Sequence, residues 1–333
     1  MSQHPKGVGE KNLGETGKGV ILVLVSAAGF GSMAVLAKVA YAGGANVVTV
    51  LALRFTAGAL LLWALLGLHL TRWSRRREAH GGARAAGQEK VRVAVGLKKS
   101  AYLFGMGALG YGAVSTLYFA SLRYLPSSAV AMFFYSYPAF VAILAYLFFR
   151  ERLERRKILA LFLSASGTLL MLWAPGLKWN TTGVLLVVFG ALIYSLYIMA
   201  VTRAVSMVTP EVMSVYVISA AAILFLGYGF VAGQLRFALT LPAWLAIGAI
   251  AVFSTAVAIA AFAAGLQKLG PAWASIVSTF EPVVTVLLAV TLLGERLTVY
   301  QLAGGMLIMG GVLLLQWVVK VKTDRQSQPT GAR

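Results

Sequence analysis

Two side chains of opposite charge lie inside long apolar stretches of the sequence and are the first candidates for chemistry. Glu281 is near the middle of the stretch 271–293 and is the only acidic residue deep inside any such stretch. Because an ionised carboxylate is costly to bury in hydrocarbon, Glu281 should carry a proton or face a cation. We therefore interpret it as a protonation site or a contact for a substrate amine. A structural carboxyl group bonded to a neighbouring helix is the alternative.

Arg54 and Lys38 are the basic residues inside apolar stretches. Arg54, the deeper of the two, could contact an anion such as a substrate carboxylate, or it could pair with Glu281. A structural role, paired with an acid or a backbone carbonyl, stays open. Lys38 is close enough to the end of its stretch to extend its amine to the membrane interface.

Prolines and tyrosines are also found in mid-stretch. Pro138 and Pro282 each lack an N–H, which frees a carbonyl one turn earlier and can kink a helix or offer an acceptor in a wet cavity. Tyrosines at this depth need hydrogen-bond partners and tend to face protein or water. They predict a ring-lined cavity for an amphipathic or aromatic solute, although helix packing explains many of them equally well. The aromatic residues concerned are Tyr111, Tyr118, Phe133, Phe134, Tyr135, Tyr137, Tyr194 and Tyr197.

The elements that must position these residues are transmembrane helices. The chain has 333 residues, of which 59% are hydrophobic and 12% charged, so its polar surface could not cover a soluble globule. Apolar runs of about 20 residues match the hydrocarbon thickness, and only helices satisfy the backbone over such lengths in lipid. Apolar runs and their Gly, Pro and charged borders predict ten helices, at 20–39, 46–68, 101–121, 126–149, 157–174, 183–204, 211–232, 242–264, 271–293 and 299–319.

The net charge of +19 predicts an orientation rather than a nucleic-acid partner, because the basic residues lie in short segments between apolar runs. With both termini in the cytoplasm, 23 basic residues are assigned to the cytoplasmic side, including Lys157 and Arg203 at span ends, and only Arg123, Lys178, Arg236 and Arg296 face outward; Lys38 and Arg54 are the two that remain inside spans. We expect a multi-pass protein of the bacterial plasma membrane. Residues 69–100 are interpreted as a cytoplasmic loop able to touch anionic lipid head groups.

A shift of 144 residues aligns the two halves of the chain. Pro138 then matches Pro282, and the triplet 151–153, Glu-Arg-Leu, matches 295–297. Because each copy has five helices, the second must enter the membrane upside down, which is the geometry of alternating access. The predicted divisions are a tail at 1–19, repeats at 20–174 and 183–319 joined by 175–182, and a tail at 320–333. Glycine pairs in 299–319 suggest a homodimer contact as an alternative to a monomer.

Three stretches resemble the EamA-type branch of the drug/metabolite transporter superfamily. They are Ala28-Gly29-Phe30-Gly31-Ser32 followed by Lys38, Leu53-Arg54-Phe55, and Phe280-Glu281-Pro282-Val283 with Leu293-Gly294-Glu295-Arg296-Leu297. Phe30 stands where the family often has tryptophan, and Tyr137-Pro138 stands where the second repeat has Glu281-Pro282. The resemblance implies a small organic solute, usually exported without ATP hydrolysis, and a cavity lined by helices one to four and six to nine.

We therefore predict a secondary transporter that exports amino acids or related zwitterions, coupled to protons or to a counter-solute. Hydrophobic cations, drugs and nucleosides are alternative substrates, and a channel or a membrane-embedded enzyme is the alternative of another class. An enzyme is not expected, because the three histidines and the only aspartate, Asp324, lie in polar segments and no catalytic pair can be identified. Without cysteine there is no thiolate metal site, and no cofactor or metal is expected. The candidate site residues are Glu281, Arg54, Tyr137, Pro138, Pro282, Lys38, Ser32, Tyr111, Tyr118 and Tyr194.

Overall fold

The structure is a computed structural model that describes residues 13–79, 95–149, 155–173 and 180–326. Within these ranges every regular element is a helix. The first repeat holds α1 (Leu13–Ala42), α2 (Val47–Ala79), α3 (Leu97–Gly105), η1 (Met106–Tyr111), α4 (Gly112–Ser121), α5 (Ser127–Phe134), α6 (Tyr137–Phe149) and α7 (Arg155–Leu172). The second holds α8 (Thr181–Ala204), α9 (Pro210–Val231), α10 (Leu241–Ala251), η2 (Val252–Val257), α11 (Ala258–Leu269), α12 (Pro271–Ser278), α13 (Phe280–Leu293) and α14 (Val299–Gln326).

The membrane-spanning character predicted from the sequence is confirmed. Within the described ranges, nine helical spans are long and apolar enough to cross a bilayer. The predicted helix 157–174 is also present, as α7, but it is not one of these nine, because Arg155, Arg156 and Lys157 occupy its first turn. Consecutive short helices such as α3, η1 and α4 together form one span.

Four predicted helix boundaries were wrong because helical backbone continues into polar sequence. Helix α2 runs through Ala79, so the predicted loop 69–100 begins with helix, and α3 starts before it ends, at Leu97. Helix α14 continues to Gln326, and α1 already begins at Leu13. Arg, Glu and Lys have high helix propensity, so the end of an apolar run is not the end of a helix.

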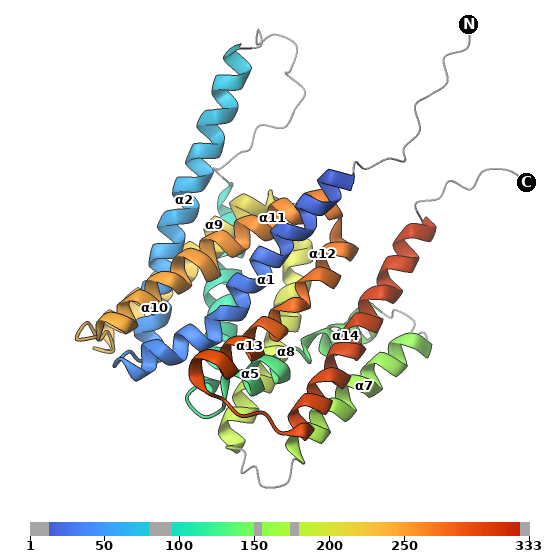
Figure 1. Cartoon of the computed structure of the whole chain (residues 1–333). Helices are drawn as coiled ribbons and strands as arrows, with labels where there is room; N and C mark the ends of the chain where they lie inside the picture. The colour runs from blue at the N-terminus through green and yellow to red at the C-terminus, as the bar shows by residue number, and fades with distance from the viewer. Residues whose placement is uncertain (1–12, 80–94, 150–154, 174–179, 327–333) are drawn as a thin grey trace, which may run out of the picture.

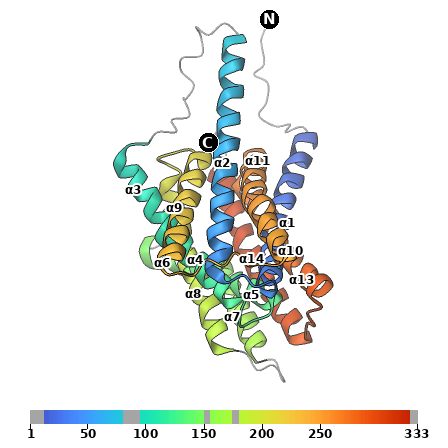
Figure 2. The same cartoon turned by 90° about the vertical axis from the view of Figure 1, so that its left-hand side faces the viewer.

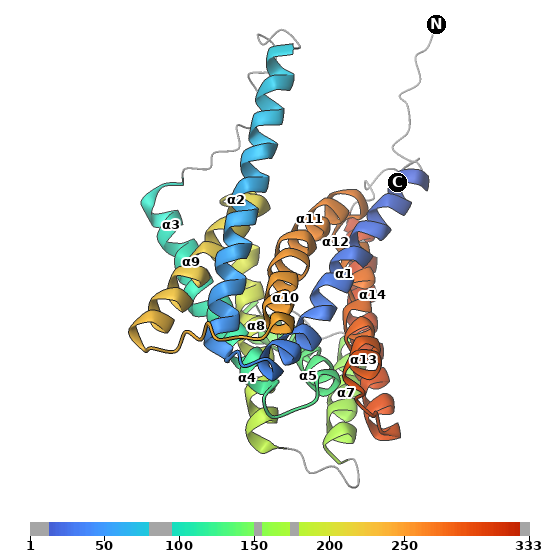
Figure 3. The same cartoon turned by 60° about the vertical axis from the view of Figure 1, so that its left-hand side comes forward.

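The two repeats run in opposite directions. Figure 1 shows that α1 begins and α14 ends at the same end of the molecule, whereas α8 begins at the opposite end. Helices α10 and α11 lie between α1 and α2, as Figures 2 and 3 show. The fifth helices, α7 and α14, pack against each other beside this bundle. The inverted five-helix repeat predicted from the 144-residue shift is therefore the architecture of the chain.

The pairing of α7 with α14 depends on glycine. A Cβ atom on Gly167 would lie 2.5 Å from the Gly304 carbonyl oxygen, and one on Gly311 would lie 2.7 Å from the Ala160 carbonyl oxygen. Gly305 similarly faces Met132 of α5. The dimer contact suggested for the glycine pairs of α14 is therefore wrong for Gly304, Gly305 and Gly311, because these glycines already pack against α7 or α5 of the same chain.

Helical breaks occur at equivalent places in the two repeats. The fourth helix is interrupted at Tyr135 and Ser136, between α5 and α6, and the ninth at Thr279, between α12 and α13. Pro138 and Pro282 follow these breaks, as their missing N–H groups lead one to expect. The third and eighth helices each contain a π-helical segment, η1 and η2. Such segments mark local departures from regular hydrogen bonding and are frequent at functional sites.

Candidate functional site

Glu281 lies in the first turn of α13, directly after the break at Thr279. The residue as a whole is half-buried. The Tyr135 hydroxyl oxygen lies 3.1 Å from Glu281 Oε2 and 3.2 Å from the Ser278 carbonyl oxygen. Pro282 lacks the N–H that would otherwise bond to this carbonyl, so the proline creates the acceptor that Tyr135 uses. Tyr135, at the break between α5 and α6 of the first repeat, therefore contacts both sides of the break at Thr279 in the second repeat.

Tyr135 can donate only one hydrogen, although two acceptors lie within reach. When Glu281 is ionised, its carboxylate and the Ser278 carbonyl compete for that hydrogen. When Glu281 is protonated, it can donate to the Tyr135 oxygen while Tyr135 donates to Ser278, and both contacts are satisfied. The geometry around Glu281 thus accommodates the neutral acid, unless a ligand brings a further donor.

The α1 backbone crosses α13 closely at Glu281. A Cβ atom on Gly31 would lie 2.6 Å from the Glu281 carbonyl oxygen, and the Thr285 hydroxyl donates to the Gly31 carbonyl at 2.8 Å. The neighbouring Gly29 meets the Phe253 carbonyl oxygen of η2 in the same way, at 2.6 Å. The Gly-Phe-Gly-Ser stretch of α1 therefore packs directly against α13 at Glu281 and against η2.

Arg54 of α2 is fully buried, at 1% exposure, yet its guanidinium has few partners. Nη1 lies 2.9 Å from the Met33 sulfur and Nη2 lies 3.2 Å from the Tyr111 hydroxyl, whereas Nε has no partner. The Phe55 and Phe119 rings face its carbon Cζ at 4.5 and 5.1 Å. Within the described ranges no acidic side chain lies at salt-bridge distance from Arg54, so the predicted alternative of an Arg54–Glu281 ion pair is not formed.

A continuous cluster of aromatic rings connects the surroundings of Arg54 with those of Glu281. The distances between ring centroids are 5.6 Å from Tyr111 to Tyr197, 6.0 Å from Tyr197 to Tyr194, 4.9 Å from Tyr194 to Tyr137 and 5.7 Å from Tyr137 to Tyr135. Because Tyr111 contacts Arg54 and Tyr135 contacts Glu281, both ends of this tyrosine cluster reach a charged group.

Tyr118 joins the tyrosine cluster from α4. Its ring is 5.0 Å from Phe134, whose ring is in turn 5.3 Å from Tyr194. Tyr118 also lies within electrostatic range of both Glu281 and Arg54. The four tyrosines predicted as site residues, Tyr111, Tyr118, Tyr137 and Tyr194, therefore lie together between the two charges.

Ser32 and Lys38 make contacts of another kind. The Ser32 hydroxyl donates to the Gly29 carbonyl at 2.8 Å and lies 3.2 Å from the Ser254 hydroxyl of η2, so it connects two helices. Lys38 is half-buried and lies within electrostatic range of Glu295. Pro138 and Pro282 contribute through the backbone, as described for the two helical breaks.

Sequence reasoning used Glu295 only as a marker of the repeat and missed its contacts. Its carboxylate accepts from the Ser127 N–H at 2.6 Å, the Ser128 N–H at 3.0 Å and the Ser128 hydroxyl at 2.6 Å. A carboxylate at this place satisfies the first N–H groups of α5 and complements the helix dipole. Ser127-Ser128 at the start of a helix was a usable signal, but the acid that caps it is distant in sequence.

Metal coordination finds no support in the part of the chain that the structure describes. There, no three His, Cys, Asp or Glu side chains are close enough together to hold an ion. The candidate site therefore consists of an under-coordinated buried cation, a half-buried acid and a tyrosine cluster between them, inside a multi-pass helical membrane protein built from two inverted repeats.

Comparison with known proteins agrees with this architecture. The model of the EamA-like transporter family matches residues 17–173 and again residues 181–317, one match for each repeat. The chain therefore belongs to the EamA-like transporter family. Curated relatives include the uncharacterized transporter YyaM of Bacillus subtilis, 23% identical over 65% of this chain and 73% of the relative. An uncharacterized transporter of Archaeoglobus fulgidus is 27% identical over 64% of this chain and 75% of its own length.

A solved crystal structure shares the fold at low sequence identity. It matches with a TM-score of 0.59 and 18% identity, covering 94% of this chain and 99% of the other. It supports the architecture and carries no information about the transported solute.

Proposed function

We propose that this transporter exports a small zwitterionic metabolite, such as an amino acid, across the bacterial plasma membrane by alternating access. The observation that carries the proposal is Arg54, a fully buried guanidinium without an acidic partner among the described residues. Leaving a buried charge uncompensated is costly, and two weak contacts from a thioether and a phenol do not compensate it well. A substrate carboxylate would supply the missing partner.

Glu281 provides the complementary half of the site. A substrate amine beside the ionised carboxylate would compensate its charge and add the donor that Tyr135 alone cannot supply to both acceptors. The tyrosine cluster between the two charges offers hydroxyls and ring faces to the rest of the molecule. One acid, one base and a polar aromatic wall together suit a zwitterion.

The inverted repeat supports movement between two states. Both repeats break their fourth helix at equivalent positions, so each half contains a place where the helix can bend. Exchange of the two conformations would open the shared site to either face. The distribution of Lys and Arg supports cytoplasmic termini, and export is the direction that the family resemblance implies.

Ligand-dependent stabilisation of the purified protein tests the substrate class. We expect L-amino acids to raise the melting temperature, whereas the corresponding amides, which lack the carboxylate, should not. Arg54→Gln should weaken amino-acid binding at least about tenfold, since hydrogen bonds to charged groups contribute about 1.5–3 kcal/mol. Arg54→Lys retains the charge but loses the planar fork and should bind with intermediate affinity.

The matched control is Arg203→Gln, which removes an exposed arginine from the last turn of α8. It should bind amino acids as the wild type does. Equal affinity in the wild type and both Arg54 variants would exclude Arg54 as the carboxylate contact. Equal stabilisation by amino acids and amides would contradict the zwitterion assignment.

Proton coupling through Glu281 has a definite sign. If an amine binds the ionised acid, binding displaces the proton, so amine affinity should rise with pH and level off once Glu281 is fully ionised. Glu281→Gln should bind more weakly and lose this pH dependence while still inserting in the membrane. Transport into proteoliposomes at a series of pH values measures both effects. A Gln variant with the wild-type pH profile would refute the coupling role.

Hydrophobic cations are the second candidate substrates. The Glu281 carboxylate beside Tyr135 and Tyr137 resembles a cation site, because aromatic faces attract a desolvated cation. This reading predicts stabilisation by quaternary amines that depends on Glu281 and is insensitive to Arg54. The same set of variants therefore separates the two candidates.

A further inference from the structure

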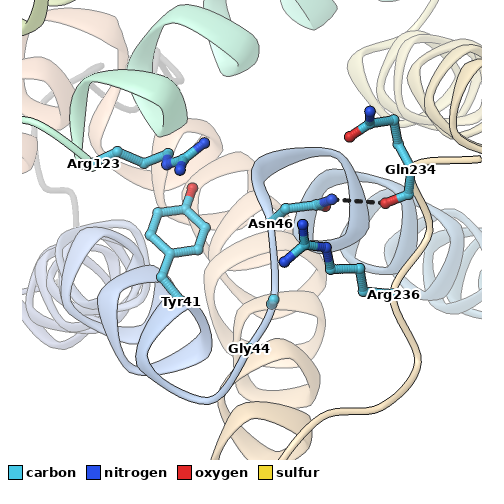
Figure 4. A pocket seen from close by; sticks show the side chains of 7 residues that line it. Tyr41, Gly44, Asn46, Arg123, Gln234 and Arg236 are labelled. Atoms are coloured by element: carbon cyan, nitrogen blue, oxygen red, sulfur yellow. Dashed lines mark hydrogen bonds between the residues drawn. The ribbon is translucent and has the colours of Figure 1, made fainter. Parts of the chain in front are cut away.

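A cavity of about 280 Å³ lies at the end of the bundle where α1 ends and α2 and α10 begin. Three connections contribute to it: the α1–α2 turn, the segment after α4 and the segment between α9 and α10. Its lining residues are Tyr41, Gly44, Ala45, Asn46, Arg123, Gln234 and Arg236. Figure 4 shows the Arg123 guanidinium directed toward the Tyr41 hydroxyl and the Arg236 side chain beside Asn46.

The cavity is positively charged without internal compensation. None of its lining residues is acidic, and the connecting segments 40–46, 122–126 and 232–241 contain no Asp or Glu. Within the described ranges the guanidinium groups of Arg123 and Arg236 form no hydrogen bond or ion pair with the protein. Two arginines from different repeats therefore meet in one concavity with their donors available.

The backbone around the cavity is fixed by side-chain hydrogen bonds. The Asn46 side-chain amide nitrogen donates to the backbone carbonyl of Gln234 at 2.7 Å. The Asn46 side-chain oxygen accepts from the backbone N–H of Thr49 at 2.8 Å. The Thr49 hydroxyl accepts from the backbone N–H of Arg236 at 2.9 Å. Gly44, with φ of 98°, makes the turn that brings α1 and α2 together. The cavity is thus built by ordered contacts between the two repeats.

Tyr41 connects this cavity with the buried site. Its hydroxyl donates to the Phe119 carbonyl at 2.9 Å, and the Phe119 ring lies 5.1 Å from the Arg54 guanidinium carbon. Tyr41 also lies within electrostatic range of both Arg123 and Arg54. The Tyr41 hydroxyl can still accept a hydrogen bond from a donor in the cavity, such as Arg123.

We infer that this cavity, here called the arginine vestibule, binds the carboxylate group of a small solute on its way to or from Arg54. The volume is close to the lower end of small-molecule sites, roughly 300–1,000 Å³, and suits a molecule of amino-acid size. Paired guanidinium forks match the planar geometry of a carboxylate. The identity of the solute rests on the proposed function, whereas anion binding by the vestibule does not.

Protection of arginine from phenylglyoxal, a reagent that modifies guanidinium groups, tests the vestibule directly. The full chain is placed in nanodiscs of neutral lipid, and the modification rates of Arg123, Arg236 and Arg203 are followed by peptide mass spectrometry. Acetate should slow modification of Arg123 and Arg236 severalfold, whereas acetamide at the same ionic strength should not. Exposed Arg203 in the same molecules serves as the control and should be unaffected. Equal slowing at all three arginines, or at none, overturns the inference.

Lipid head groups carry phosphate, which a guanidinium binds equally well, so the nanodisc experiment is repeated with anionic lipid. Protection by acetate in neutral lipid supports a solute site. Protection that appears only with anionic lipid overturns the solute assignment and identifies a head-group site.

Two variants connect the vestibule with transport. Arg123→Gln and Arg236→Gln should each raise the apparent KM for an amino acid offered from the vestibule side about tenfold, as expected for loss of one charged contact. The KM from the other side should change less, and Arg203→Gln should change neither. An unchanged KM on the vestibule side in both variants overturns the vestibule role. If amino acids are not transported at all, the proposed function fails, but acetate protection still decides whether the vestibule exists.

Discussion

The broken helices of the two repeats have the same backbone interruption but different chemistry. In the second repeat, Glu281 follows the break. The Tyr135 hydroxyl of the first repeat lies within hydrogen-bond distance of both the Glu281 carboxylate and the Ser278 carbonyl. In the first repeat the equivalent position holds Tyr137, which donates no hydrogen bond to the protein within the described ranges. The helical break is therefore a shared property of the repeat, whereas the acidic group at the break belongs to one copy alone.

The starts of the two broken helices differ as well. Glu295 caps α5 through three donors of Ser127 and Ser128. The equivalent positions at the start of α12 are Pro271, which has no N–H, and Ala272, which has no hydroxyl. Glu151, the repeat counterpart of Glu295, lies outside the described residues. The donor set that Glu295 uses on α5 is therefore not available on α12.

The largest expected effect comes from breaking the α5 cap. Glu295→Gln removes the charge from an acceptor of three hydrogen bonds and should lower the free energy of unfolding by roughly 2–3 kcal/mol. Thermal or denaturant unfolding in nanodiscs measures the loss. The control is Glu211→Gln in the first turn of α9, where only a dipole interaction of about 0.3–1 kcal/mol is removed. Equal losses in the two variants would show that the cap does not distinguish the helix starts.

The next effect separates two neighbouring tyrosines at the break. Tyr135→Phe leaves the Ser278 carbonyl without a donor and should cost about 1–2 kcal/mol of stability. Tyr137→Phe removes a hydroxyl that donates to no described residue and should cost less than about 0.5 kcal/mol. The same unfolding measurement compares them. If Tyr137→Phe is the more damaging change, the hydrogen-bond asymmetry between the repeats is wrong.

How far the sequence predicts this molecule depends on the range of the interactions involved. Apolar length predicts the ten helices, and the 144-residue shift predicts their inverted arrangement, because both properties are local or repeated. The break after Tyr135 could be anticipated from Pro138. The π-helical segments could not, since neither the stretch 106–111 nor the stretch 252–257 contains a proline.

The candidate site was only partly predictable for the same reason. Glu281 and Arg54 stand out because a charge in an apolar stretch is conspicuous in any sequence. Their pairing as one ionic contact was a reasonable expectation but is not formed, since the tyrosine cluster lies between them. That Tyr135 rather than Tyr137 reaches Glu281 depends on how two helices from different repeats face each other, which no local pattern encodes.

The smallest expected effect tests whether Pro282 creates the acceptor that Tyr135 uses. Pro282→Ala supplies an N–H that can bond to the Ser278 carbonyl, so it should change stability by less than about 1 kcal/mol. In this background Tyr135→Phe should cost about 0.5–1 kcal/mol less than in the wild type, because the carbonyl is no longer left without a donor. A double-mutant cycle measured by unfolding gives this coupling energy directly. The matched cycle with Pro138→Ala should show no coupling, since Pro138 follows the other break and its freed carbonyl, on Phe134, accepts nothing from Tyr135. Additivity in both cycles would mean that Tyr135 and the Ser278 carbonyl are merely close together, and that the proline does not determine what distinguishes the second break from the first.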